Sequence, residues 1–275
     1  MRPQPGPFVT PAAQALRYLG TEATRPTPPR PTTLPPSCSP RRQRYNILFF
    51  DTTHAASNAV WGKPAHVILD LHNHSIKSDD ARAKVENYCQ WIRSRDIPID
   101  GIVLTEHRQF EPTDYTPLEK KYGLVILEGS EVETEYGHVL VYGVTEGLMR
   151  EFDFARIDNP LADVLAAVEK HGAIAAPAHP GRARVGMFAH TEQLGVPEGI
   201  SIVEVYNGGS REDEDQVAMD NAQKFGYRGI GGSDAHIVSH IGRCGTRFPD
   251  RIESMGELVE ALAAGEFEAL KLQKK

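Results

Sequence analysis

Two pairs of metal-binding side chains repeat the same spacing in distant parts of the chain. His72 and His74 are two residues apart, and Asp234 and His236 are separated in the same way. In an extended strand, residues i and i+2 point to the same face, so each pair aims both side chains at one point. Imidazole and carboxylate groups together suit borderline divalent metals such as zinc, manganese or iron. The spacing therefore predicts a metal site.

Further polar residues follow other apolar runs, where a charged group or an imidazole must be solvated, paired or bound to a metal. Among the carboxylates, Glu131 is able to bridge two metal ions. Several ions held close together would acidify a bridging water to hydroxide and clamp a transferring phosphoryl group. Arg182 and Arg243 are candidates for binding phosphate oxygens in a forked geometry. The other polar residues at the ends of these runs are Glu106, His107, His179, Glu204 and Asn207.

The apolar runs that carry these side chains alternate with helical patterns. This alternation predicts a largely parallel sheet, and parallel α/β barrels place ligand-binding residues at the C-terminal ends of their strands. Residues 131–133 and 138–143 favour a hairpin. The expected strands cover residues 67–69, 101–104, 124–127, 138–143, 173–176, 200–206 and 229–231, with a final strand or tail at 266–272. The expected helices cover residues 81–95, 160–170, 211–224 and 256–263, with Asp79 or Asp80 able to cap the first.

Composition narrows the class of protein. The 275 residues, 40% of them hydrophobic, can bury a core as one domain with a tail. The net charge of -7 argues against a nucleic-acid scaffold held by charge, and no apolar run is long enough to span a membrane. Cys38, Cys89 and Cys244 have no CxxC spacing, which predicts a reducing, cytoplasmic compartment and no disulfide framework.

The chain is expected to divide into three segments. Residues 1–45 are rich in proline and arginine and poor in acids, so they are predicted to form a disordered extension. Residues 46–64 are interpreted as a linker or an extra strand. Residues 65–275 carry the predicted catalytic barrel and every candidate site residue.

The order of these motifs resembles that of the PHP (polymerase and histidinol phosphatase) superfamily, over most of the chain after residue 65. The resemblance implies an α/β fold, a distorted (β/α)7 TIM-like barrel, and two or three divalent metal ions (Mn, Zn or Fe). Glu106 stands where the family usually has aspartate, and we expect it to orient a ligand histidine. The four motifs are DLHNHS (70–75) followed by Ser78-Asp79, TEH (105–107), AHP (178–180) and SDAH (233–236).

The resemblance also implies the ligands of three metal sites. Asp79 takes a place where some members of the family use histidine. The implied sets are His72, His74, Glu131 and Asp234 for the first site, Glu131, His138 and His179 for the second, and Asp79, His107 and His236 for the third.

The expected function is hydrolysis of a phosphate ester, such as a phosphomonoester or a nucleotide phosphate, with a metal-bridging hydroxide as nucleophile. The expected catalytic residues are Glu131, His236, Arg182 and Arg243. A protonated histidine near the third metal or a metal-bound water would protonate the leaving group. The candidate substrates are a nucleotide, an oligonucleotide end, histidinol phosphate and other small phosphomonoesters, and the sequence leaves the oligomeric state open.

Two alternatives remain open at the level of sequence. Amidohydrolases that cleave C–N bonds also carry HxH on the first barrel strand, although that class usually has a metal-bridging lysine late in the barrel. No suitable lysine follows a predicted strand here. The second alternative is a non-catalytic regulatory module that binds metal, in which the ligand set would serve stability alone.

Overall fold

The structure, a computed structural model, describes residues 66–211 and 213–273. The predicted extension (1–45) and the predicted linker or extra strand (46–64) lie outside the described residues. The strands are β1 (Val67–Asn73), β2 (Gly101–His107), β3 (Val125–Thr134), β4 (Gly137–Tyr142), β5 (Ile174–Pro177), β6 (Ile202–Asn207), β7 (Arg228–Gly232), β8 (Cys244–Phe248) and β9 (Glu268–Lys271). The helices are α1 (Val85–Ser94), α2 (Thr116–Tyr122), α3 (Leu161–Lys170), α4 (Thr191–Leu194), α5 (Glu214–Phe225) and α6 (Met255–Ala264), with 3₁₀ turns η1 (Leu148–Arg150), η2 (Met187–Ala189) and η3 (Val238–His240).

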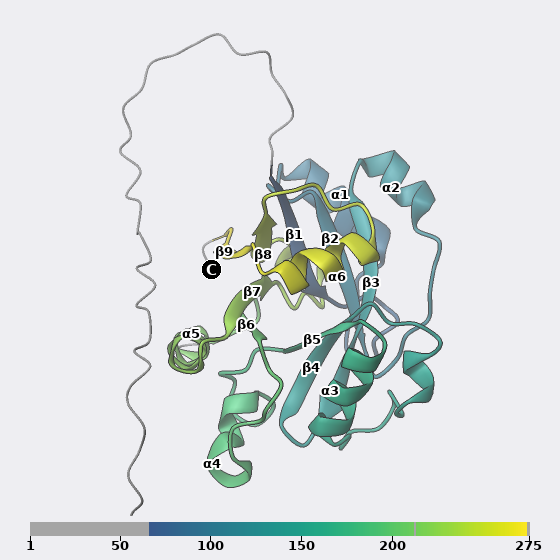
Figure 1. Cartoon of the computed structure of the whole chain (residues 1–275). Helices are drawn as coiled ribbons and strands as arrows, with labels where there is room; N and C mark the ends of the chain where they lie inside the picture. The colour runs from purple at the N-terminus through teal and green to yellow at the C-terminus, as the bar shows by residue number, and fades with distance from the viewer. Residues whose placement is uncertain (1–65, 212, 274–275) are drawn as a thin grey trace, which may run out of the picture. The chain divides into compact units, whose positions relative to one another are not determined.

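Strands β1 to β7 close into a distorted barrel (Figure 1). The main sheet has the order β5-β4-β3-β2-β1-β8-β9, and β6 and β7 form a separate parallel pair. β6 packs beside β5, and β7 packs beside β1. After β7 in the sequence, Ala235 forms a single parallel bridge with Asn73 at the end of β1. The predicted α/β barrel is therefore confirmed, with a seam where regular pairing is interrupted.

The sheet is mixed, whereas the sequence predicted a largely parallel one. β1, β2 and β3 are parallel, but β4 is antiparallel to both β3 and β5. The reason is the predicted β3–β4 hairpin, whose tight turn at 135–136 reverses the chain and leaves β5 to resume the direction of β3. β8, which the sequence analysis missed, is antiparallel to the first half of β1 and to β9.

Several helix boundaries differ from the predicted ones. α1 begins at Val85 and not at residue 81, and its N-cap is Lys84, so neither Asp79 nor Asp80 caps it. α5 begins at Glu214, three residues later than predicted, and α2 was not predicted at all. Within residues 66–211 and 213–273, no helix combines the length and the apolar character needed to cross a membrane.

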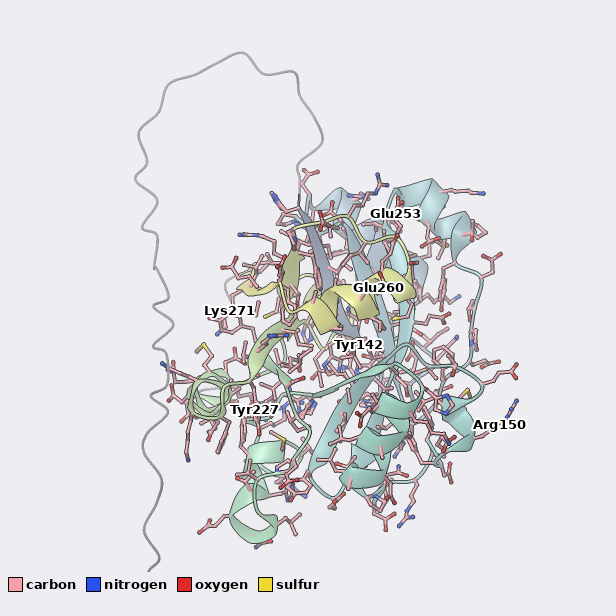
Figure 2. All side chains as sticks on the ribbon, in the orientation of Figure 1. Tyr142, Arg150, Tyr227, Glu253, Glu260 and Lys271 are labelled. Atoms are coloured by element: carbon pink, nitrogen blue, oxygen red, sulfur yellow. The ribbon has the colours of Figure 1, made fainter. Side chains whose placement is uncertain are left out.

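Apolar side chains fill the barrel interior. Leu69 and Leu71 of β1 pack in one buried cluster with Leu140 and Tyr142 of β4 and Ile230 of β7. The hydroxyl of Tyr142, which is labelled in Figure 2, donates a hydrogen bond to the Leu71 carbonyl at 3.1 Å. This packed interior is typical of barrels whose active sites lie on one end and not in the centre.

A second buried cluster lies under α1. The helix buries Val85, Tyr88, Cys89 and Ile92, whose three- and four-residue spacing places them on one face. Cys89 and Cys244 are both buried free thiols, and burial raises the pKa of the Cys89 thiol to about 11. The third cysteine, Cys38, lies outside the described residues.

Gly232 lies where the end of β7 meets β1. A Cβ atom at Gly232 would overlap the Cβ of His72 and lie 2.7 Å from the His72 backbone nitrogen. We expect Gly232→Ala to lower the free energy of unfolding by about 1–3 kcal/mol, the usual cost of overpacking, and to lower metal content. Urea denaturation of the metal-free protein measures the first effect.

Gly256 in α6 provides the matched control. A Cβ atom there meets only the Ser254 hydroxyl, at 3.9 Å. Gly256→Ala is therefore expected to leave stability unchanged or to raise it by up to about 1 kcal/mol, because alanine is the better helix former. Equal losses in the two variants would contradict the tight fit of β7 against β1.

Candidate metal centre

Six histidines and two buried carboxylates meet at one end of the barrel. Each comes from the end of a strand or from the loop that follows it, except His138, which lies near the start of the reversed strand β4. His179 and Asp234 have φ angles of 31° and 51°, which cost energy for residues other than glycine and are frequent at functional sites. The converging residues are His72, His74, His107, Glu131, His138, His179, Asp234 and His236.

The first implied ligand set converges. The Nε2 atoms of His72 and His74 lie 3.3 and 3.1 Å from Oε2 of Glu131. The same two nitrogens lie 3.5 and 3.4 Å from Oδ1 of Asp234. His72 and Glu131 are completely buried. The ends of β1 and β7, which meet at the seam of the barrel, and strand β3 therefore bring ligand atoms to a single point.

Hydrogen bonds on the outer side of the rings set the tautomers of His72 and His74. Nδ1 of His72 lies 3.1 Å from Glu204 Oε1, and a carboxylate can only accept, so Nδ1 carries the proton. Nδ1 of His74 lies 3.3 Å from the Ser78 hydroxyl, which itself donates to Glu106. Both Nε2 atoms are then left with lone pairs that face each other at 3.0 Å. Such an approach is favourable when a proton or a metal ion lies between the two nitrogens.

The second implied ligand set converges on the other oxygen of the same carboxylate. Oε1 of Glu131 lies 2.9 Å from Nδ1 of His138 and 3.1 Å from Nε2 of His179. The other nitrogen of His179, Nδ1, is buried without a hydrogen-bond partner. Glu131 thus presents one oxygen to each of two groups of imidazoles, which is the arrangement expected of a bridging carboxylate.

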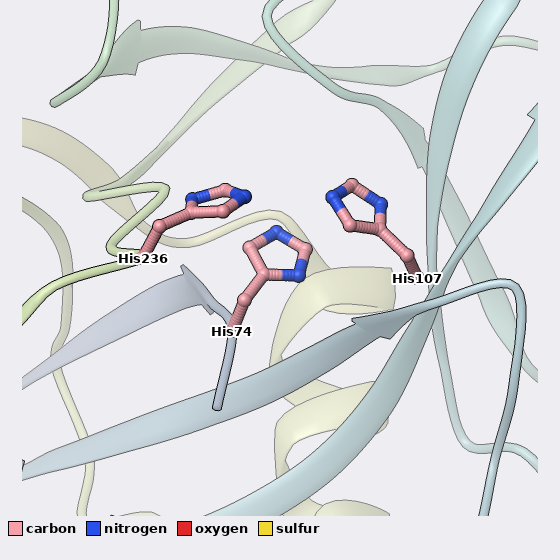
Figure 3. A group of neighbouring side chains, drawn as sticks. All are labelled: His74, His107 and His236. Atoms are coloured by element: carbon pink, nitrogen blue, oxygen red, sulfur yellow. The ribbon is translucent and has the colours of Figure 1, made fainter. Parts of the chain in front are cut away.

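The third group contains a correction to the sequence analysis. The rings of His74, His107 and His236 surround a common space in Figure 3. Asp79 does not join them: its side chain is 76% exposed and pairs with Arg108. The neighbouring Asp80 lies there instead, with Oδ2 3.1 Å from His236 Nε2 and 3.5 Å from His107 Nε2. A turn at 75–81 rotates the chain, so the motif position alone does not decide which aspartate faces inward.

Paired substitutions distinguish the two aspartates. We expect Asp80→Asn to remove about one metal ion per chain, because it deletes a carboxylate that lies within 3.5 Å of two imidazoles. Asp79→Asn makes the same chemical change one residue away and is expected to leave metal content unchanged. Elemental analysis of both proteins after dialysis against buffered metal is the measurement. Loss of an ion in the Asp79 variant alone would restore the motif-based assignment.

Mutual electrostatics hold the cluster together in the absence of an ion. Burial lowers the pKa of His72, but the charges of Glu204 and Glu131 outweigh it and raise that pKa well above its ordinary value. Burial lowers the pKa of His107 in the same way, and Glu131 then raises it to about 9. For Glu131 and Asp234 burial raises the pKa, but the neighbouring histidines, His72 first, lower it well below the usual range. Protons on the imidazoles can thus take the place of metal cations.

Buried acids behind the cluster orient its histidines. Glu204 accepts hydrogen bonds from His72 Nδ1 and, at 2.7 Å, from the backbone nitrogen of His179. Glu106 acts on His74 through the Ser78 hydroxyl, and both its oxygens accept from the Ser75 backbone nitrogen. The sequence analysis gave Glu204 no role, although an acid inside the apolar strand β6 already required a buried partner.

The two candidate arginines are placed differently. Arg182 lies beside the cluster, and its Nη2 donates to Asp234 Oδ2 at 3.1 Å and to Asn207 Oδ1 at 3.0 Å. Arg243 is not part of the cluster: its Nη1 donates to the Gly208 carbonyl, and its side chain lines a neighbouring cavity. The turn at Gly242, with a φ of 71°, directs the chain away from the metal ligands before β8 begins.

The donor set fits divalent metal ions. For a tetrahedral ion with ligand bonds of about 2.1 Å, the ligand atoms lie about 3.4 Å apart. The nitrogen and oxygen atoms of the first group are separated by 3.0 to 3.5 Å. His107 Nδ1 approaches Glu131 Oε2 to 3.0 Å without the alignment of a hydrogen bond, as two ligands of one ion do. Mixed imidazole and carboxylate donors are typical of zinc, manganese and iron sites.

Comparison of sequences finds similarity to one protein family and to an uncharacterized protein. A family model described as PHP-associated matches residues 214–267. An uncharacterized protein of Methanocaldococcus jannaschii is 24% identical over 190 residues, which cover 66% of this chain and 70% of that protein.

Solved structures share the fold at low identity. PsfC from Pseudomonas syringae has a TM-score of 0.54 at 17% identity, covering 75% of this chain and 91% of its own. The lesion-specific endonuclease PfuEndoQ from Pyrococcus furiosus has a TM-score of 0.53 at 15% identity, covering 74% and 57%. An amidohydrolase from Chromobacterium violaceum with bound sulfate has a TM-score of 0.50 at 16% identity, covering 75% and 98%. The family match over residues 214–267, the four motifs and the distorted barrel that brings them together support membership of this chain in the PHP superfamily.

Proposed function

We propose that this chain is a metal-dependent hydrolase and that its substrates are phosphate esters. The observation that carries the proposal is the convergence of His72 Nε2 and His74 Nε2, 3.0 Å apart, beside two buried carboxylates. Divalent ions held there supply a Lewis acid that lowers the pKa of water and neutralises the charge of a phosphate group. A ligand set of this kind is the usual basis of hydrolysis without a protein nucleophile.

The chain's own residues have distinct roles in this proposal. Glu131 holds two groups of ligands at a fixed separation, because each of its oxygens faces one group. Glu204 keeps the proton of His72 on Nδ1 and so leaves Nε2 free to bind an ion. Arg182, about one-quarter exposed, places a positive charge at the open side of the cluster, where a phosphate oxygen can reach it.

Two kinds of support favour a phosphate ester over an amide. Within residues 66–211 and 213–273, no lysine forms an ion pair or hydrogen bond with the clustered histidines and acids. PfuEndoQ, which has the same fold, is an endonuclease, and endonucleases cleave phosphate esters. The protein of similar fold from Chromobacterium violaceum is an amidohydrolase, so C–N hydrolysis stays as the second candidate.

Parallel substrate panels test the proposal. The protein loaded with manganese, zinc or iron is assayed against nucleoside monophosphates, a 5′-phosphorylated oligonucleotide and p-nitrophenyl phosphate. The same preparation is assayed against a panel of amides. We expect release of phosphate that depends on added metal and no amide cleavage. Cleavage of amides alone would contradict the phosphate-ester proposal, and inactivity on both panels would favour a regulatory metal module.

A further inference from the structure

A cavity of about 750 Å³ lies beside the metal cluster, which is within the usual size range for small-molecule sites. Its walls come from the loop after β6, the start of α5, the residue before β8 and the end of β9, where Lys271 is labelled in Figure 2. Cys244 of β8 pairs with Lys271 of β9, and β8 runs antiparallel to β1. The cavity therefore lies at the same end of the barrel as the cluster.

The cavity carries an excess of positive charge. Arg211, Arg243 and Lys271 line it together with one carboxylate, Asp215. Lys271 Nζ lies 2.8 Å from Asp215 Oδ2, so these two charges compensate each other. Within the part of the chain that the structure describes, neither arginine has a carboxylate at ion-pair distance. The forked geometry of these two guanidinium groups suits phosphate and carboxylate groups.

The cavity and the cluster share one wall. Asn207 lines the cavity, and its Oδ1 accepts from the Arg182 nitrogen that also donates to Asp234. Arg243 is tied to the same region, because its backbone nitrogen donates to the Ser233 hydroxyl at 2.8 Å.

Two glycines continue that wall. Gly208 lines the cavity, while a Cβ atom at Gly209 would lie 3.2 Å from both Arg182 Nη2 and Asp234 Oδ2. No side chain projects from this stretch between the two sites. A ligand held at the cluster can therefore extend over the glycines into the cavity.

We propose that this cavity binds a second anionic group of the substrate, with Arg211 and Arg243 as its partners. The proposal rests on the proposed function, since it takes the reacting phosphate to lie at the cluster. It narrows the substrate class to organic phosphate esters that carry a further phosphate or carboxylate on the leaving-group side. Asp215 does not oppose such a group, because Lys271 neutralises it.

Phosphonates test this proposal without turnover, because their C–P bond is not a phosphate ester. Binding of butylphosphonate, carboxybutylphosphonate and tetramethylene bisphosphonate to the metal-loaded protein is measured by calorimetry. We expect at least one of the two compounds with a second anionic group to bind about tenfold or more tightly than butylphosphonate, the gain of a charge-assisted pair. The tighter of the two identifies the second group as phosphate or carboxylate.

Three arginine variants locate the effect. Arg211→Gln and Arg243→Gln are expected to reduce that preference to less than about threefold. Arg247→Gln, four residues beyond Arg243 and paired with Glu268 outside the cavity, should retain the full preference. Thermal melts establish that each variant is folded.

The possible failures have different meanings. Equal binding of all three phosphonates by the unaltered protein, or a preference that survives both cavity variants, would overturn the cavity proposal alone. Absence of binding by any phosphonate, together with no hydrolysis of phosphate esters, would overturn the proposed function and the cavity proposal with it.

Discussion

Glu131→Gln is expected to lower kcat/KM on any phosphate ester that the protein hydrolyses by at least about 10³-fold. Glu131 is the only residue of the cluster whose atoms face all of His72, His74, His107, His138 and His179. Glutamine keeps the shape but loses the negative charge, and its amide group turns an N–H toward nitrogens that must face a cation. Steady-state assays with saturating metal, together with elemental analysis, measure both consequences.

Glu133→Gln is the matched control for this change. Glu133 is two residues farther along β3, is 23% exposed and pairs with Arg108. It lies opposite His138 on β4, but within the described residues its side chain forms no ion pair with a clustered imidazole. The same loss of one charge there should change kcat/KM by less than about threefold, as for other exposed ion pairs. A Glu131 variant that kept its metal ions and more than a tenth of its activity would show that the cluster is not the reaction site.

The positions of the barrel strands could be predicted from the sequence, because each strand is a short buried run. The direction of each strand could not be predicted in this way. The runs at β1, β2 and β3 are continuous and apolar, which marks strands covered on both faces. β8, by contrast, reads Cys-Gly-Thr-Arg-Phe and has no apolar run. It is a strand because β1 and β9 offer it hydrogen-bonding edges on both sides, and those contacts are distant in sequence.

Among the candidate metal ligands, too, some could be predicted from the sequence and others could not. His72 and His74 were predictable, because a strand fixes the direction of residues i and i+2. Asp80 was not, because it lies in a turn, where no regular period relates sequence position to direction. Arg243 was proposed as a phosphate ligand of the reaction site for its forked geometry, and its side chain lines the adjacent cavity. His179, Asp234 and His236 lie in loops after strand ends, and they were predicted from the motif order and not from strand geometry.

Removal of metal is expected to lower the melting temperature by roughly 5–15 °C relative to the protein with metal at 100 to 1,000 times its dissociation constant. The ion would bind the converging nitrogens of His72 and His74 and neutralise the buried charges of Glu131 and Asp234. An ion that binds only the folded chain stabilises it by mass action. Melts in chelator and after addition of zinc, manganese or iron measure the shift.

The melting shift and the Glu131 variant answer different questions. A shift that Glu131→Gln abolishes places the stabilising ion at this cluster, because the variant removes the ligand shared by two of its groups. The same shift without hydrolysis of any ester or amide would indicate a structural or regulatory metal. Identical melting with and without metal would mean that protons on His72 and His107, whose pKa values the carboxylates raise, already provide all the charge the cluster needs. In that case the ligands would be a proton-linked network and not a metal centre.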